Sequence, residues 1–152
     1  MGRFIGNHEC KIDSKARAII PAAIKKQLLA TGETFVLKKA VLHPCIELYP
    51  LAEWEKILEK LSELNPYDPE VDLFIRKFQD GIKIVDIDTT GRLLIAKDLA
   101  TYANITKDIV LTSKINIIEI WDAELYQQAN AISNDDYKAL TQNIMAKIYP
   151  KI

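Results

Sequence analysis

The chain is organised around one ten-residue stretch, Ile12-Asp13-Ser14-Lys15-Ala16-Arg17-Ala18-Ile19-Ile20-Pro21. It recurs 75 positions later as Ile87-Asp88-Thr89-Thr90-Gly91-Arg92-Leu93-Leu94-Ile95-Ala96. Both copies contain Asp-x-x-x-Arg, then an apolar strand and the start of a helix. A second pair of segments, Cys45–Tyr49 and Ile117–Trp121, repeats with an offset of 72. The sequence therefore predicts two copies of one supersecondary unit.

Each copy is expected to run strand, turn, strand, short helix, strand, strand. In the first copy the expected strands are 7–12, 17–20, 35–37 and 46–49, and the short helix runs from Pro21 to about Leu29. Between the copies, apolar residues at helical spacing predict helices over 51–64 and from Pro69 to about 80. The face predicted to be buried on the second of these consists of Val71, Phe74, Ile75 and Phe78. Asp68 is the expected cap of the helix that starts at Pro69, and Asp122 and the segment 134–136 are expected caps of two last helices, the second ending near Tyr149.

These elements divide the chain into four parts. The expected parts are a first repeat at 7–54, a helical connector at 55–81, a second repeat at 82–125 and C-terminal helices at 126–152. The fold class is α+β and rich in strands, because each repeat contributes four strands and one short helix.

Composition excludes several classes of protein. With 49% hydrophobic and 27% charged residues, the chain of 152 residues is typical of a globular protein. No apolar run approaches the roughly 20 residues that a membrane helix needs, and the N-terminus lacks the apolar stretch of a secretory signal. The chain has only two cysteines, so we expect a reducing, cytoplasmic location. Because no apolar run is long enough for a membrane helix, we also expect no membrane partner.

The net charge of −1 conceals two opposite regions. Residues 1–40 contain eight basic and three acidic residues, a net charge of +5. Residues 51–80 contain four basic and eight acidic residues, a net charge of −4. A local basic surface attracts an anionic partner, so this distribution favours a nucleic acid at the first repeat.

The Asp-x-x-x-Arg pattern has a mechanical role in a tight turn. The Asp carboxylate can accept backbone N–H groups across the turn, and the Arg can reach back to it. Asp13, Asp88 and Arg92 are therefore predicted to orient their turns. The first copy differs from the second in having Lys15 where the second has Thr90, and Lys11 where it has Asp86. The residues predicted to contact DNA are Arg17, Lys15, Arg3 and Lys11, because phosphates and base edges require such donors.

The same residues carry a resemblance to a known family. The matching segments are Phe4–Gly6, Asp13–Arg17 with Ile20-Pro21, His43–Pro50, Glu53-Trp54, Gly91–Ile95 and Glu119–Asp122. Together they resemble the MraZ family of bacterial transcriptional regulators, which is built from two AbrB-like (SpoVT-AbrB) repeats. One departure is Ala16, which stands where the family commonly has Gly. Either this turn differs, or Ala16 takes a positive φ at a cost of about 1 kcal/mol.

The resemblance implies a fold, an assembly and a partner. The implied fold interlocks the two swapped-hairpin repeats into one double-psi-like barrel with flanking helices. The implied assembly is a closed ring of identical copies. The implied activity is binding to direct repeats of double-stranded DNA in the promoter of the division and cell-wall gene cluster, including the regulator's own gene, and hence association with the nucleoid. No cofactor and no small-molecule substrate are implied.

Three other functions are weighed against DNA binding. His8, Cys10, His43 and Cys45 can be read as zinc ligands, but their spacing is unlike that of known sites, so we predict no metal. A Gly-rich phosphate loop and a motif-supported catalytic triad are both absent, so we predict no enzyme activity. The remaining alternative is an AbrB-like protein-interaction or scaffold module that does not bind DNA.

Overall fold

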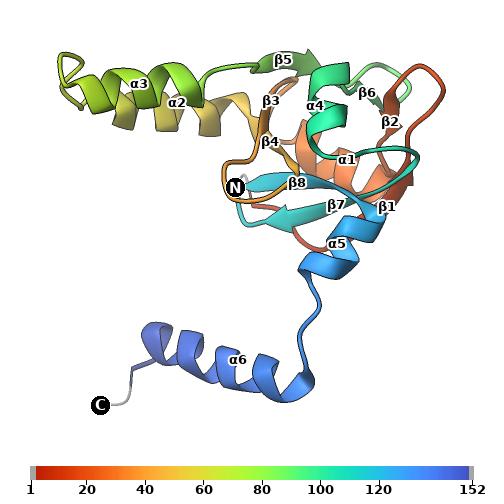
Figure 1. Ribbon diagram of the computed structural model, residues 1–152. Coiled ribbons are helices and arrows are strands. Elements are labelled where there is room, and N and C mark those ends of the chain that lie inside the picture. The colour runs from red at the N-terminus through yellow and green to blue at the C-terminus, as the bar shows by residue number, and fades with distance from the viewer. Residues whose placement is uncertain (1–2, 151–152) are drawn as a thin grey trace.

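Strands and helices follow the duplicated order in residues 3–150, which the computed structural model describes (Figure 1). The first repeat contains β1 (Asn7–Lys11), β2 (Arg17–Ile19), α1 (Ala22–Leu29), β3 (Thr34–Lys39) and β4 (Ile46–Pro50). The connector contains α2 (Leu51–Leu61) and α3 (Pro69–Phe78). The second repeat contains β5 (Lys83–Asp86), β6 (Arg92–Leu94), α4 (Lys97–Tyr102), β7 (Asp108–Lys114) and β8 (Ile117–Asp122). Two helices follow, α5 (Ala123–Ala129) and α6 (Asn134–Ile148). The mixed α+β class is confirmed.

The two repeats interlock through their strands. A six-stranded antiparallel sheet has the order β1-β7-β8-β4-β3-β5, and β2 and β6 form a separate two-stranded ribbon. β1 and β2 are joined by the first turn, yet each pairs with a strand of the second repeat, and only the bridge Ile12↔Ala18 joins them directly. At the centre of the sheet Glu47 lies opposite Glu119, its own equivalent in the repeat. The repeats are therefore related by an approximate twofold axis that passes between β4 and β8.

Equivalent residues of the two repeats fill one core. Alternation along the strands directs every second side chain inward, and α1 and α4 cover the interior with apolar faces. The buried pairs of equivalents are Ile24 and Leu99, Leu28 and Ala103, Phe35 and Ile109, Leu37 and Leu111, Ile46 and Ile118, and Leu48 and Ile120. Neither repeat can bury this surface alone, so the duplication stabilises the fold.

The connector helices are less buried than the apolar pattern predicts. Trp54 of α2 is buried and stacks on Phe78 of α3, with ring centroids 5.5 Å apart. The predicted face of α3 is only partly buried in the single chain: Val71, Ile75 and Phe78 are half-buried, but no residue of α3 is fully buried and Phe74 is 48% exposed. α2 also ends at Leu61, before the predicted end at 64. Both helices project from one side of the body (Figure 1), so only their ends near the sheet, at Trp54 and Phe78, join the buried cluster with Val36 and Tyr49.

Three helix caps show how local sequence sets the ends of these elements. The side chains of Asp68 and Asp122 accept N–H groups of α3 and α5, which confirms both predicted caps. The cap of α6 is Ser133 rather than a residue of 134–136, because its Oγ accepts the Asp136 N–H at 3.1 Å. No helix within residues 3–150 combines the length and apolar character needed to cross a membrane.

Candidate nucleic-acid interface

The first Asp-x-x-x-Arg turn is held together by one carboxylate. Asp13 Oδ1 accepts the backbone N–H groups of Lys15 at 2.9 Å and of Arg17 at 3.0 Å. Its Oδ2 accepts Arg17 Nε–H at 2.9 Å, as predicted for the orienting partner. The Arg17 N–H, followed by the Lys15 N–H and the Arg17 side chain, holds the pKa of Asp13 below its usual value. The turn is thus fixed with Asp13 charged.

The second turn repeats this geometry. Asp88 Oδ1 accepts the backbone N–H groups of Thr90 and Arg92, both at 2.9 Å. Its Oδ2 accepts Arg92 Nε–H at 2.9 Å. These hydrogen bonds, that of the Arg92 N–H first, lower the pKa of Asp88 to about 2. The hydrogen-bonding part of the motif is therefore the same in both repeats, and the orienting roles of Asp88 and Arg92 stay a prediction.

Both turns require a left-handed residue before the Arg. Gly91 has φ 80° and Ala16 has φ 62°, so Ala16 keeps the conformation of the Gly at the cost that left-handed backbone imposes on an L residue. A Cβ on Gly91 would lie 3.1 Å from Cδ of Lys25, which reaches over the second turn from α1. The equivalent of Lys25 on α4 is Ala100, a much smaller side chain. The first repeat thus has the larger turn residue, Ala16, with the smaller helix residue, Ala100, whereas the second repeat has the smaller turn residue, Gly91, with the larger helix residue, Lys25.

The β2–β6 ribbon connects the two turns. Arg17 pairs with Leu94, and Ile19 pairs with Arg92, so the two arginines lie at opposite ends of one face. The intervening residues Ala18 and Leu93 are buried, whereas Ile19 and Leu94 are 50% and 55% exposed. The outer face of the ribbon therefore presents two arginines with two apolar side chains between them, a feature that β alternation around the motif could have revealed.

Arg17 is positioned for a further contact. Only its Nε is used in the pair with Asp13, and within residues 3–150 the two terminal guanidinium nitrogens make no hydrogen bond. Those nitrogens form a planar fork suited to phosphate oxygens or to the O6 and N7 atoms of guanine. The carboxylate thus orients the guanidinium without consuming its donors.

The surroundings of the two turns differ in charge. Ile12 N–H donates to the Lys107 carbonyl at 2.8 Å, which places Lys107 of the second repeat beside the first turn. Around the first turn the charged residues are Lys11, Asp13, Lys15, Arg17, Lys107 and Asp108. Their equivalents around the second turn are Asp86, Asp88, Thr90, Arg92, Glu33 and Thr34, most of which line a common cleft. Lys25 of α1 also reaches the second turn, whereas its equivalent is the neutral Ala100. The first set has a net charge of +2, and the second set together with Lys25 has a net charge of −1.

The predicted contact residues do not all lie together. Lys15 is exposed at the tip of the first turn, and Lys11 lies beside it with its Nζ 3.8 Å from Asp108 Oδ1. Arg3 lies near the other end of β1, since Phe4 N–H donates to the Ile115 carbonyl at the β7–β8 turn. At about 3.3 Å per residue, β1 spans roughly 13 Å from Asn7 to Lys11, and Arg3 lies beyond the end that is away from Lys11. Lys107 was missed because it is distant in the sequence, and only the strand pairing brings it to the site.

The four residues considered as zinc ligands lie in different parts of the molecule. Cys10 packs against the main core, and Cys45 lies in a cluster with Trp121 on the other face of the sheet. Burial raises the pKa of each thiol to about 12. Among residues 3–150, no three His, Cys, Asp or Glu side chains are grouped as a metal site would require.

These features define a tandem-repeat α+β protein in which two carboxylate-locked turns flank a β ribbon and one turn is basic. Residues 3–77 and 81–144 match the family model described as "MraZ protein, putative antitoxin-like". The chain belongs to the MraZ family.

Three relatives show how far the similarity extends. The Transcriptional regulator MraZ of Flavobacterium psychrophilum is 47% identical over 149 residues, covering 97% of this chain and 95% of that protein. The Transcriptional regulator MraZ of Christiangramia forsetii is 46% identical over 146 residues, covering 95% and 94%. The Transcriptional regulator MraZ of Clostridium tetani is 38% identical over 141 residues, covering 93% and 96%. The similarity thus includes both repeats and the connector.

Proposed function

We propose that this chain is a transcriptional regulator that binds double-stranded DNA through its first Asp-x-x-x-Arg turn. The observation that carries the proposal is the charge difference between two turns of the same geometry, +2 at the first and −1 at the second with Lys25 included. A purely structural motif gives no reason for this difference, whereas a phosphate backbone selects for the basic turn.

The ribbon supplies a way of entering the DNA. The major groove of B-DNA admits a two-stranded β ribbon, and a guanidinium there can donate to the O6 and N7 of guanine. In this arrangement Arg17 reads a base while Lys15, Lys11 and Lys107 neutralise phosphates. Ile19 and Leu94, at the centre of the outer face, provide apolar contacts of the kind that thymine methyl groups accept. Arg3 is distant from the turn and serves a separate phosphate contact.

The finer features of the proposal come from the family resemblance. Closure of the interlocked repeats into a double-psi-like barrel is supported by the pairing of β2 with β6 and of β1 with β7. We propose that copies of the chain form a closed ring and bind direct repeats in the promoter of the division and cell-wall gene cluster, including the chain's own gene. Several turns on one ring multiply a weak single contact when the DNA repeats match their spacing. The protein then works in the cytoplasm on the nucleoid, without a cofactor or an enzymatic activity.

The substitution Arg17→Ala tests the site. The expected result is a loss of about 10-fold or more in affinity for DNA from upstream of the chain's own gene, the effect of one good base contact. The matched control is Arg92→Ala, which removes the same ion pair from the acidic turn. Fluorescence anisotropy measures the affinity, and light scattering checks that the oligomer is unchanged. Equal losses for both variants would refute the assignment to the first turn.

The alternative is a protein-interaction module that does not bind DNA. The observation that favours it is the uncovered apolar surface of α3 and α6, including Leu73 and Phe74. Affinity for DNA that falls steeply with salt supports the regulator, because it measures phosphate contacts. Absence of any salt-dependent DNA binding supports the interaction module.

A further inference from the structure

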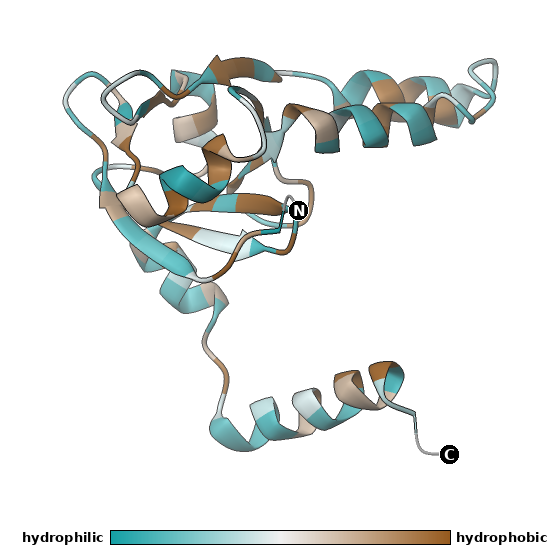
Figure 2. Cartoon of the chain, turned by 180° about the vertical axis from the view of Figure 1, so that it is seen from behind, coloured by the Kyte–Doolittle hydropathy of each residue, from teal (hydrophilic) through white to brown (hydrophobic). Residues whose placement is uncertain are grey.

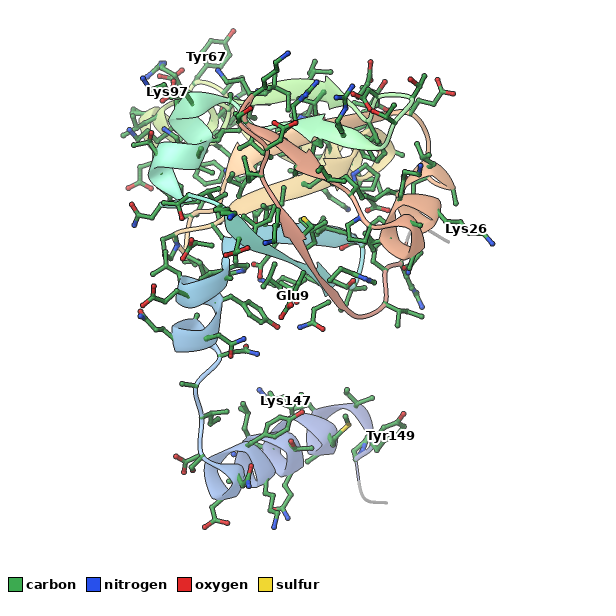
Figure 3. The ribbon with its side chains drawn as sticks, turned by 90° about the vertical axis from the view of Figure 1, so that its right-hand side faces the viewer. Glu9, Lys26, Tyr67, Lys97, Lys147 and Tyr149 are labelled. Atoms are coloured by element: carbon green, nitrogen blue, oxygen red, sulfur yellow. The ribbon has the colours of Figure 1, made fainter. Side chains whose placement is uncertain are left out.

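The last helix carries an apolar stripe that the rest of residues 3–150 leaves about half exposed. Tyr137, Leu140, Ile144 and Ile148 recur at helical spacing on α6, with Met145 at their edge. Between 42% and 60% of the surface of each is exposed. Figure 2 shows apolar colour on α6 away from any neighbour, and Figure 3 shows its residues Lys147 and Tyr149 well separated from the body. Such a stripe is the signature of a helix that packs on a partner surface.

Helix α6 also needs a partner for its own stability. An isolated helix of about 12–15 residues is marginal in water, and α6 has 15 residues. Within residues 3–150 no hydrogen bond or ion pair links α6 to the body. The segment 130–133 connects α6 to the end of α5. The cap by Ser133 fixes where the helix begins but does not cover its apolar face.

A complementary surface exists beside α2. A cleft of about 600 Å³ lies between α2 and the turn that joins β7 to β8. Its apolar lining consists of Tyr49, Ile57, Leu61 and Ile117. At 1.5 Å per residue, α2 is about 16 Å long and α6 about 22 Å, so a helix can lie along the cleft over two or three turns.

The charges of the two surfaces are opposite. Residues 51–80 have a net charge of −4, and the cleft itself is lined by Glu53, Glu59 and Glu63 against Lys56 and Lys60, a net charge of −1. Beyond its first turn, residues 137–150, α6 contains Lys138 and Lys147 and no acidic residue. The lysines flank the apolar stripe, so docking places cations beside the acidic rim while the stripe enters the cleft.

We propose that α6 of one copy docks in the α2 cleft of a second copy. Each copy then offers one helix and one cleft, and the contact is head to tail, which generates a ring when the rotation closes. The position of α6, extended away from its own body, suits it to reach a neighbour (Figure 1). This inference rests on the assembly part of the proposed function and identifies the surfaces that make it.

Complementation between two full-length variants tests the docking. The helix variant combines Leu140→Glu with Ile144→Glu and keeps an intact cleft. The cleft variant, Leu61→Glu, keeps an intact helix. Each variant alone is expected to be a monomer of 17.3 kDa by light scattering, whereas the wild type is a larger oligomer. A 1:1 mixture is expected to double the mass, because it restores one junction per pair and no more.

The control and the contrary outcomes separate the alternatives. Gln142→Glu with Ala146→Glu adds the same charges to the opposite face of α6 and is expected to keep the wild-type mass. Circular dichroism checks that every variant is folded, and Leu61→Ser replaces Leu61→Glu if the latter is not. Variants that keep the wild-type mass would show a ring built through other surfaces, and a mixture that stays monomeric would show that α6 pairs elsewhere or with its own body. A monomeric wild type would refute the docking and the ring while leaving DNA binding at the first turn untouched.

Discussion

Exchanging the residue at the tip of each turn is the sharpest test of how charge is distributed in this protein. Lys15 and Thr90 occupy equivalent positions on turns whose hydrogen bonds have the same pattern. The variant Lys15→Thr gives the first turn the tip of the second, and Thr90→Lys makes the reverse change. Neither substitution alters the carboxylate or the arginine that hold the turn, so the fold is expected to be unchanged.

The expected magnitude follows from which cations are already neutralised. Arg17 is paired with Asp13 at 2.9 Å, and Lys11 lies 3.8 Å from Asp108. Within residues 3–150 Lys15 forms no ion pair, so its whole charge is available to a phosphate. Loss of one phosphate contact lowers the slope of log K against log salt by about 0.9. Lys15→Thr should therefore weaken binding by about 5-fold per contacting copy at 0.15 M salt, and its defect should shrink by about 3.5-fold per copy between 50 and 200 mM.

Anisotropy titrations of one DNA fragment at four salt concentrations measure both quantities. Thr90→Lys is the matched control, because it adds the same charge to a turn surrounded by Asp86, Asp88 and Glu33. It is expected to leave the slope unchanged. The reasoning is refuted if Lys15→Thr retains the wild-type slope, or if Thr90→Lys raises the slope by as much as Lys15→Thr lowers it.

Two further predictions concern the turns themselves. Gly91→Ala should lower the free energy of unfolding by about 1 kcal/mol, because φ 80° strains an L residue and the new methyl group approaches Lys25. Ala16→Gly should leave the free energy of unfolding unchanged or raise it by about 0.5 kcal/mol. Urea denaturation measures both variants, and equal effects would contradict this explanation. The pKa of Asp88 is about 2 in the folded protein and about 3.9 unfolded, so its stabilising contribution is complete above about pH 5 and is lost as the pH falls toward 2. Asp88→Asn should therefore differ from wild type in stability at pH 6 and converge with it near pH 2, and a difference that does not depend on pH would show that the carboxylate charge is not responsible.

Local sequence predicted the repeating unit because the turn and its helix are encoded within ten residues. Asp13 and Arg17 need only a tight turn to meet, and the cap at Asp68 needs only the next two residues. The strand order could not be derived in this way. β1 pairs with β7 about 100 residues away, a choice made by shared burial rather than by any signal in either strand. The helices and strands could therefore be predicted from residue patterns, whereas the interlocking of the two repeats could be predicted only from the family resemblance.

The residues of the candidate site fall into the same two groups, those that local sequence predicts and those that depend on strand pairing. Lys15 and Arg17 could be predicted because they belong to the motif, and Lys107 could not because it reaches the first turn only through the hydrogen bond from Ile12. The face predicted to be buried on α3 is only partly covered, for a related reason. Helical periodicity indicates that Phe74 lies on an apolar face, but it does not indicate whether residues of the same chain pack against that face.

The approximate twofold symmetry explains how one chain can combine a symmetric, stable core with two turns of different charge. Residues that the symmetry places in the core are apolar in both repeats, as Phe35 and Ile109 are, because both face the same interior. Residues at the turn tips face solvent and make no such demand, so Lys15 and Thr90 can diverge at little cost in stability. A chain with two basic turns at opposite ends of the ribbon would present two competing sites for one DNA groove. An acidic second turn leaves one basic turn per copy, with one polarity, which is the condition that the proposed ring requires if its copies are to bind DNA repeats that all point in the same direction.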